Sequence, residues 1–183
     1  MKKIIAFGAS NSKESINKKL ANYIANKVNG AQVKLLDLND FEMPIFSVDR
    51  ENENGIHELA YQFKKEIIEA DGIVISLAEH NGAYSAAFKN IYDWVSRISS
   101  DDVWEGKPMF LAATSPGSMG GKTVMKIAKD RFKRRNSNVI VNFSLPYFSK
   151  NYSTQNGITD VDLNAELEIQ LKTFEAAIQK ISV

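Results

Sequence analysis

Apolar residues fall along the chain in two alternating patterns. Five short, nearly continuous apolar runs have the length of β-strands that are buried on both faces. These runs are residues 4–7, 33–36, 73–77, 109–113 and 139–143. Between and after them, five longer segments carry apolar residues at every third or fourth position, as one face of a helix does. These segments begin near residues 16, 56, 88, 124 and 163.

This alternation, in a chain of 183 residues, predicts one α/β domain that spans residues 1–183. Right-handed crossovers make the strands parallel and place helices on both faces of an open sheet. Five strands are too few to close an eight-stranded barrel. Ligands of such sheets bind beyond the carboxyl ends of the strands. The loops after the first, third and fourth strands are therefore the candidate binding loops. Residues 39–54 and 145–160 are irregular, and we interpret them as surface loops, with lids or partner-contacting arms as the alternatives.

The composition narrows the function classes. Lys and Arg (23) nearly balance Asp and Glu (22), so no overall field recruits nucleic acid or an anionic membrane, and any basic site must be local. Cysteine is absent, which excludes disulfides, thiolate catalysis and thiolate metal sites, so redox chemistry would need a cofactor. No segment approaches the roughly 20 apolar residues of a membrane span, and the first apolar run is too short for a signal peptide. We expect a cytoplasmic protein without membrane or nucleic-acid partners.

The loop after the first strand combines serine residues with the start of a helix. Ser10, Ser12 and Ser15 lie at the start of that helix, where unpaired backbone N–H groups and the positive end of the helix dipole favour an anion. Neither G-x-G-x-x-G nor the Walker pattern is present, so a mononucleotide phosphate fits better than a pyrophosphate or a triphosphate. The alternative is that Ser15 only caps the helix and that the other serines only form turns.

The loop after the third strand places several chemical groups in a few residues. An Asn-Gly pair predicts a tight turn whose backbone edges could read a flat heterocycle. The loop contains Glu79, His80, Asn81, Gly82, Ala83 and Tyr84. His80 could act as an acid or base, although a lone loop histidine is more often a simple polar contact. With only one other histidine in the chain and no H-E-x-x-H pattern, we expect no metal site.

The loop after the fourth strand is rich in glycine. It resembles a Walker loop, but the spacing fails by one residue because Pro116 stands where a glycine is needed. A flat ligand could still approach its backbone closely, or it could be a flexible turn. The loop contains Ser115, Pro116, Gly117, Ser118 and Gly120. The helix that follows carries six cations over residues 126–135, which we interpret as a solvated face or as a subsite for the extra phosphate of NADPH.

Three blocks of the chain resemble the NADPH-dependent FMN reductase family of flavodoxin-like proteins, over roughly the first 145 residues. Residues 9–17 resemble the family's first loop, G-S-x-R-x-x-S-x-N, with Ser12 in place of the arginine and Ala9 in place of the glycine. Residues 78–94 resemble P-E-Y-N-G-S-Y…L-K-N-x-x-D-W, with His80 in place of the tyrosine. Residues 106–108 and 114–121 resemble the family's fourth strand and its glycine-rich loop.

This resemblance implies a flavodoxin-like three-layer sandwich with strand order 2-1-3-4-5 and an FMN cofactor. It implies an oxidoreductase with a ping-pong reaction, in which NADPH or NADH reduces the flavin and a small acceptor (free flavin, a quinone, an azo compound or a metal oxyanion) then takes the electrons. No side-chain acid or base is required for hydride transfer, so no catalytic residue is expected. By the same resemblance, the phosphate would be held by Ser10, Ser12, Ser15, the Ile16 N–H group and Asn17. Residues 79–84 would contact the ring, and residues 115–120 would form a wall beside it. Family members form homodimers or homotetramers, so residues 44–49 and the helix around Trp94 could contact a partner chain. The alternatives are a flavodoxin-like electron carrier and a non-redox binding module.

Overall fold

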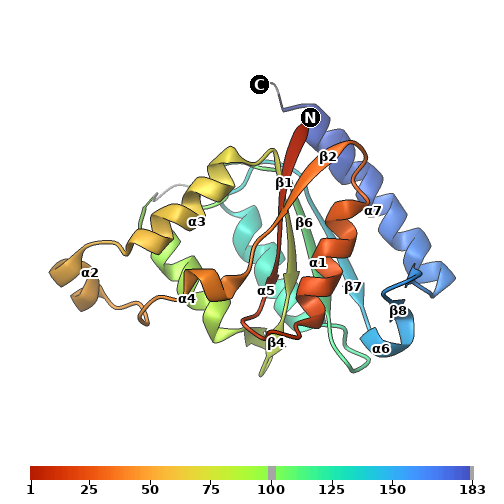
Figure 1. Cartoon of the computed structure of the whole chain (residues 1–183), viewed down its shortest axis with the longest axis horizontal. Helices are drawn as coiled ribbons and strands as arrows, with labels where there is room; N and C mark the ends of the chain where they lie inside the picture. The colour runs from red at the N-terminus through yellow and green to blue at the C-terminus, as the bar shows by residue number, and fades with distance from the viewer. Residues whose placement is uncertain (99–101, 182–183) are drawn as a thin grey trace.

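A five-stranded parallel sheet forms the centre of the molecule, with strand order β2-β1-β3-β6-β7 (Figure 1). The structure is a computed structural model and describes residues 1–98 and 102–181. The strands are β1 (Lys2–Ala9), β2 (Ala31–Leu35), β3 (Gly72–Leu77), β6 (Met109–Thr114) and β7 (Ile140–Leu145). Each contains most of an apolar run found in the sequence. The order confirms the predicted flavodoxin-like topology, since β6 and β7 are the fourth and fifth strands of this sheet.

Five longer helices cover the two faces of the sheet. Two of them, α1 (Ile16–Asn26) and α7 (Val161–Gln179), pack on one face together with the inward side chains of Ile4 and Phe110. On the other face lie α3 (Glu58–Glu69), α4 (Ala86–Val95) and α5 (Lys122–Lys133). Because both faces are covered, the central strands β3 and β6 are buried along their whole length. The five helical patterns of the sequence are thus confirmed.

The two stretches predicted to be surface loops contain short elements. Residues 39–54 include most of the 3₁₀ helix η1 (Leu38–Phe41) and all of α2 (Val48–Asn54). Residues 145–160 include α6 (Phe148–Asn151) and the strands β8 (Tyr152–Ser153) and β9 (Gly157–Ile158). Each of these elements is too short to display a helical or strand period. None of the helices in the described residues is long and apolar enough to cross a membrane.

The carboxyl ends of the strands meet at the lower edge of the view in Figure 1. There the β1–α1 loop lies beside a small hairpin, β4 (Glu79–His80) and β5 (Ala83–Tyr84), and the β6–α5 loop. The fold therefore brings together the three loops that the sequence analysis selected.

Candidate functional site

A cavity of about 220 Å³ opens at this edge, between the β1–α1 loop, the start of the hairpin and the end of β6. Its lining includes Ser10, Ser12, Ser15, Ile16, Asn17, Glu79, His80, Ser115 and Pro116. These nine residues are all candidates from the sequence, and Glu14, Ala78 and Thr114 complete the lining. Residues far apart in the chain thus share one depression.

The β1–α1 loop is shaped to receive an anion. Ser15 caps α1, because its Oγ accepts the Lys18 N–H at 3.1 Å, and Ser12 N–H donates to Ser10 Oγ at 3.1 Å. The backbone N–H groups of Ile16 and Asn17 have no acceptor within the described part of the chain. Free amides at a helix N-terminus, together with serine hydroxyls, match the needs of a phosphate monoester. The donor set therefore fits the phosphate end of FMN.

Gly8 allows α1 to begin close to β1. A Cβ atom at this position would lie 2.3 Å from the backbone nitrogen of Lys18 and 2.6 Å from its Cα. These neighbours are backbone atoms of the helix and cannot rotate away. Only glycine therefore permits the close approach that brings the N-terminus of α1 over the end of the strand.

The Asn17 side chain holds the β1–α1 loop against the central sheet. This side chain is buried, with Oδ1 accepting from Ser76 Oγ at 2.7 Å and from Thr114 N–H at 3.1 Å. Its Nδ2 donates to the Thr114 carbonyl at 3.2 Å. The side-chain amide thus joins α1 to β3 and β6, while the backbone N–H stays available at the loop surface.

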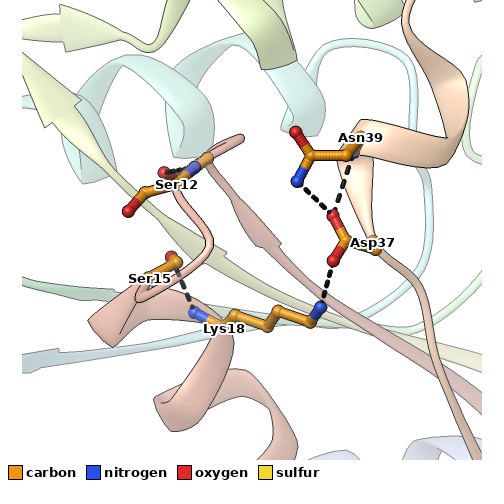
Figure 2. Close-up of polar contacts among 6 residues, drawn as sticks. Ser12, Ser15, Lys18, Asp37 and Asn39 are labelled. Atoms are coloured by element: carbon orange, nitrogen blue, oxygen red, sulfur yellow. Dashed lines mark hydrogen bonds and ion pairs between the residues drawn. The ribbon is translucent and has the colours of Figure 1, made fainter.

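The two lysines in the first turn of α1 are paired with carboxylates. Lys18 reaches Asp37, whose other oxygen accepts from Asn39 N–H at 2.9 Å and Asn39 Nδ2 at 2.7 Å (Figure 2). The Lys18 ammonium, followed by the Asn39 amide, lowers the pKa of the Asp37 carboxyl. Lys19 pairs with Glu14 at 3.0 Å. With serine at position 12, the loop offers an anion mainly neutral donors and the helix dipole.

The β4–β5 hairpin turns through Asn81 and Gly82, whose φ angles are +52° and +76°. Two positive φ angles in a two-residue loop match the type I′ turn that Asn-Gly favours, so the predicted tight turn is confirmed. The hairpin leans on α5, because the Glu79 carboxylate accepts the Val124 N–H at 3.0 Å. Gly121, the N-cap residue of α5, supplies no side-chain cap, so Glu79 caps that helix from another element.

The other end of the hairpin is tied to β1. Ser85 Oγ donates to the Ala9 carbonyl at 2.8 Å and accepts the Phe88 N–H at 3.2 Å, which caps α4. The Tyr84 ring packs edge-on against Phe88, with 5.3 Å between the ring centres. Burial raises the pKa of the Tyr84 hydroxyl, which has no hydrogen-bond partner among the described residues.

The six residues predicted to contact the ring therefore differ in whether their side chains are exposed or bonded within the protein. His80, Asn81 and Ala83 are exposed at the hairpin, whereas the side chains of Glu79 and Tyr84 are engaged with neighbouring helices. Sequence analysis did not select Ser85, although a serine directly before an apolar helical segment is a signal for a helix cap.

The β6–α5 loop is held by the segment after β7. Tyr147 N–H donates to the Gly117 carbonyl at 3.0 Å, and Phe148 N–H donates to the Ser115 carbonyl at 3.1 Å. A Cβ on Gly120 would lie 2.6 Å from Ser144 Oγ, so glycine permits this contact. Pro116, Gly117 and Ser118 are exposed at its tip. Gly120 and Gly121 therefore permit close packing, whereas a Cβ on Gly117 would have no neighbour within 4 Å.

A family model described as NADPH-dependent FMN reductase matches residues 2–148. The chain belongs to this family. This confirms the recognition made from the sequence, and the family description agrees with the predicted oxidoreductase class and with FMN and NADPH as cofactor and donor.

Similar proteins include reductases of quinones. A 2-hydroxy-1,4-benzoquinone reductase from Burkholderia sp is 33% identical over 119 residues, which are 64% of this chain and 63% of that protein. An NADPH:quinone oxidoreductase from Arabidopsis thaliana is 32% identical over 96 residues, 52% of this chain and 47% of that protein. The matches thus span less than two thirds of these relatives.

Solved structures share the fold over nearly the whole chain. The NAD(P)H:(acceptor) oxidoreductase FerB from Paracoccus denitrificans has a TM-score of 0.76 at 24% identity and covers 98% of each chain. An azoreductase from Bacillus anthracis has a TM-score of 0.64 at 14% identity, covering 99% of this chain and 100% of its own. These likenesses establish the fold.

Proposed function

We propose that the protein is an FMN-dependent NAD(P)H oxidoreductase that passes electrons to a small, flat acceptor such as a quinone. The observation that carries this proposal is the cavity at the carboxyl edge. There, unpaired amides at the start of α1 and serine hydroxyls lie beside the hairpin. Family membership and the quinone reductases among the relatives support it.

In this proposal the β1–α1 loop holds the phosphate. The hydroxyls of Ser10 and Ser12 and the N–H groups of Ile16 and Asn17 donate to its oxygens, while Ser15 keeps the helix start in place. Asn17 contributes its side chain only by supporting the loop.

The other two loops position the ring in this proposal. Backbone groups of the hairpin from Glu79 to Tyr84 flank one part of it, and residues 115–120 form a wall on another side. Bound FMN would supply the redox chemistry, since it can take a hydride from NAD(P)H and pass the electrons on to a second substrate. The protein's part is to bind and orient both substrates, so no catalytic side chain is assigned.

The ping-pong order and the breadth of acceptors are part of the same proposal. The cavity is open, which suits successive use of one surface by donor and acceptor. Initial rates over a grid of NADPH and quinone concentrations should give parallel double-reciprocal lines. Converging lines would contradict the ping-pong order and leave the flavin assignment intact. Free flavin, an azo dye and a metal oxyanion, tested beside a quinone, would rank the acceptors.

Fluorescence titration of the purified protein with FMN tests the function directly. Ser12→Ala is a clean variant, because the structure gives the Ser12 hydroxyl no other hydrogen bond in the described residues, and it should weaken FMN binding about tenfold or less. Ser137→Ala, an exposed serine in the turn before β7 at the amino end of the sheet, is the matched control and should change nothing. A folded protein that leaves FMN fluorescence unchanged at micromolar concentration would refute the proposal. FMN binding with negligible steady-state NADPH oxidation would instead favour an electron carrier.

We also propose that the enzyme is a homodimer or homotetramer that uses the segment 44–49. Ile45 and Val48 in this segment are 77% and 59% exposed. The segment is fixed to α4, since Trp94 Nε1 donates to the Pro44 carbonyl at 2.8 Å and Phe46 packs edge-on against the Trp94 ring. The Trp94 side chain is itself buried within the chain, so the exposed apolar contacts would come from the segment. Light scattering should give a multiple of the chain mass that Ile45→Ser with Val48→Ser reduces to one chain, whereas a monomeric mass would refute the assignment.

A further inference from the structure

The charges of this nearly neutral chain are strongly separated along the sequence. Residues 106–159 hold nine cationic side chains and one carboxylate, whereas the rest of the chain holds 14 cations and 21 carboxylates. The positive region comprises β6, α5, β7, α6 and the short β8–β9 hairpin, which lie on one side of the sheet order. An overall charge of +1 therefore conceals a local field that can attract a polyanion.

Four lysines of α5 form a row. Lys122, Lys126, Lys129 and Lys133 are all exposed and follow one another at intervals of three or four residues, so they share one side of the helix. The row extends over about 16 Å. None of the four makes an ion pair with a described residue, and Lys129 donates instead to the Asn142 side chain at 2.9 Å.

This lack of partners is unusual for the lysines of this protein. Outside residues 106–159, ion pairs within the described chain involve Lys2, Lys18, Lys19, Lys27, Lys34, Lys64, Lys65 and Lys89. The four lysines of α5 thus have no ion pair among the described residues, and the helix contains a single carboxylate, Asp130.

Exposed apolar side chains lie at the end of the row nearest the cavity. Met119 is 58% exposed, and its carbonyl accepts the N–H of Lys122 at 3.0 Å. Tyr147 is 46% exposed and adjoins the same loop through its bond to Gly117. Lys150 follows Tyr147 within one turn, since its N–H donates to the Tyr147 carbonyl at 2.9 Å. Two exposed apolar side chains and the exposed Lys150 thus lie near the start of the lysine row in the connected β6–α5 and β7–α6 segments. We call the lysine row, Met119, Tyr147 and Lys150 together the cationic face.

We propose that the cationic face docks the protein on an anionic lipid surface. A row of this length suits an extended polyanion better than one phosphate group of a dinucleotide. Beside these cations, the exposed Met119 and Tyr147 can enter the interface of a bilayer, which adds apolar burial to the electrostatic attraction. The inference goes beyond the proposed function, and docking here would present the carboxyl edge of the sheet, where the cavity opens, close to lipid-soluble quinones.

Flotation of the full chain, with FMN added, tests the proposal on phosphatidylcholine vesicles with and without 30% phosphatidylserine. We expect binding only to the anionic vesicles. Lys122→Gln, Lys126→Gln and Lys129→Gln together should lower the partition coefficient about a hundredfold, since each lysine near such a surface contributes about fivefold. The charge-matched control neutralises three exposed lysines of other helices, Lys65, Lys172 and Lys180, and should have little effect.

A second pair of variants tests the apolar part of the cationic face. Met119→Ser with Tyr147→Ser should weaken vesicle binding, whereas Tyr61→Ser with Ile68→Ser, two exposed apolar residues of α3, should not. Equal losses in a variant and its control would overturn the proposal, as would no binding to anionic vesicles at low salt.

Lysine-dependent binding to polyuridylate without vesicle binding would assign the cationic face to nucleic acid instead. The triple lysine variant could instead raise the KM for NADPH but not for NADH and leave vesicle binding unchanged. That result would overturn the proposal and assign the cationic face to the extra phosphate of NADPH. Flotation needs no catalytic activity, so its failure is distinct from failure of the proposed function.

Discussion

Replacing Asn17 with alanine should destabilise the protein far more than an ordinary polar substitution on a helix does. The side chain makes three buried hydrogen bonds, two through Oδ1 and one through Nδ2. Their partners are the Ser76 hydroxyl and both backbone groups of Thr114, and neither residue is exposed. Alanine at position 17 would therefore leave three polar groups of β3 and β6 without these bonds.

The magnitude follows from those groups. An unsatisfied buried donor or acceptor costs about 1–3 kcal/mol, and the Ser76 hydroxyl can rotate, so its contribution lies at the lower end. The total is about 3–7 kcal/mol, a large part of the 5–15 kcal/mol that stabilises a typical domain. For a chain of this size it corresponds to a fall in Tm of about 6–28 °C.

Urea unfolding and thermal melts of the flavin-free protein measure this effect without interference from a ligand. Asn26→Ala is the matched control, because Asn26 is an exposed asparagine on the same helix whose side chain bonds, among the described residues, only to Asn22. It should change stability by less than about 0.5 kcal/mol. If Asn17→Ala were no more destabilising than Asn26→Ala, the argument that the amide joins α1 to β3 and β6 would be refuted. A double-mutant cycle with Ser76→Ala should show coupling above 0.5 kcal/mol, as expected for residues in contact.

Three further substitutions test separate parts of the site. Ser12→Arg restores the arginine of the family pattern and should tighten FMN binding roughly 10- to 100-fold, the effect of a charge-assisted hydrogen bond; an unchanged Kd in the FMN titration would show that position 12 does not face the phosphate. Glu79→Gln keeps an acceptor for the Val124 N–H and should cost about 0.3–1 kcal/mol in urea unfolding, less than Glu79→Ala, which removes the cap of α5 as well; equal losses would contradict the capping role. Tyr84→Phe removes a buried, unpartnered hydroxyl and should not destabilise the protein at pH 7. Because the folded-state pKa of Tyr84 is raised, its protonated form contributes stability below about pH 10 that is lost as the pH rises further, so unfolding at pH 7 and 10.5 should show a smaller alkaline loss in the variant.

Much of the scaffold could be predicted from the sequence because its signals are local. The run at residues 73–77 and the helix cap at Ser15 depend on pattern and on neighbouring residues alone, and both appear in the structure. The helix α2 could not be found, because none of its residues is buried and no apolar period marks it. It is positioned instead by tertiary contacts, such as the pair between Arg97 and Glu51.

The sequence predicted which loops form the candidate site, but it did not predict what each side chain in those loops bonds to. The sequence indicates that Glu79 and Asn17 lie at the carboxyl edge. It contains no signal that the first caps α5 or that the second bonds to β6, because each of these bonds joins residues at least 45 positions apart in the chain. A side chain's role is decided by its distant partner, which a local pattern does not contain.

These distant bonds also explain how the chain departs from the family pattern at the surface of the site without losing the fold. Buried or partly buried hydrogen bonds position the loops. Asn17 bonds to β6, Ser85 bonds to β1, and Glu79 bonds to α5. Ser12 and His80, two of the positions that differ from the family pattern, are exposed and carry none of this support through their side chains. Substitution there therefore changes what the site offers a ligand and leaves the positions of the loops unchanged. We therefore predict that Ser12→Ala and His80→Ala change the free energy of unfolding by less than about 0.5 kcal/mol, whatever they do to ligand binding.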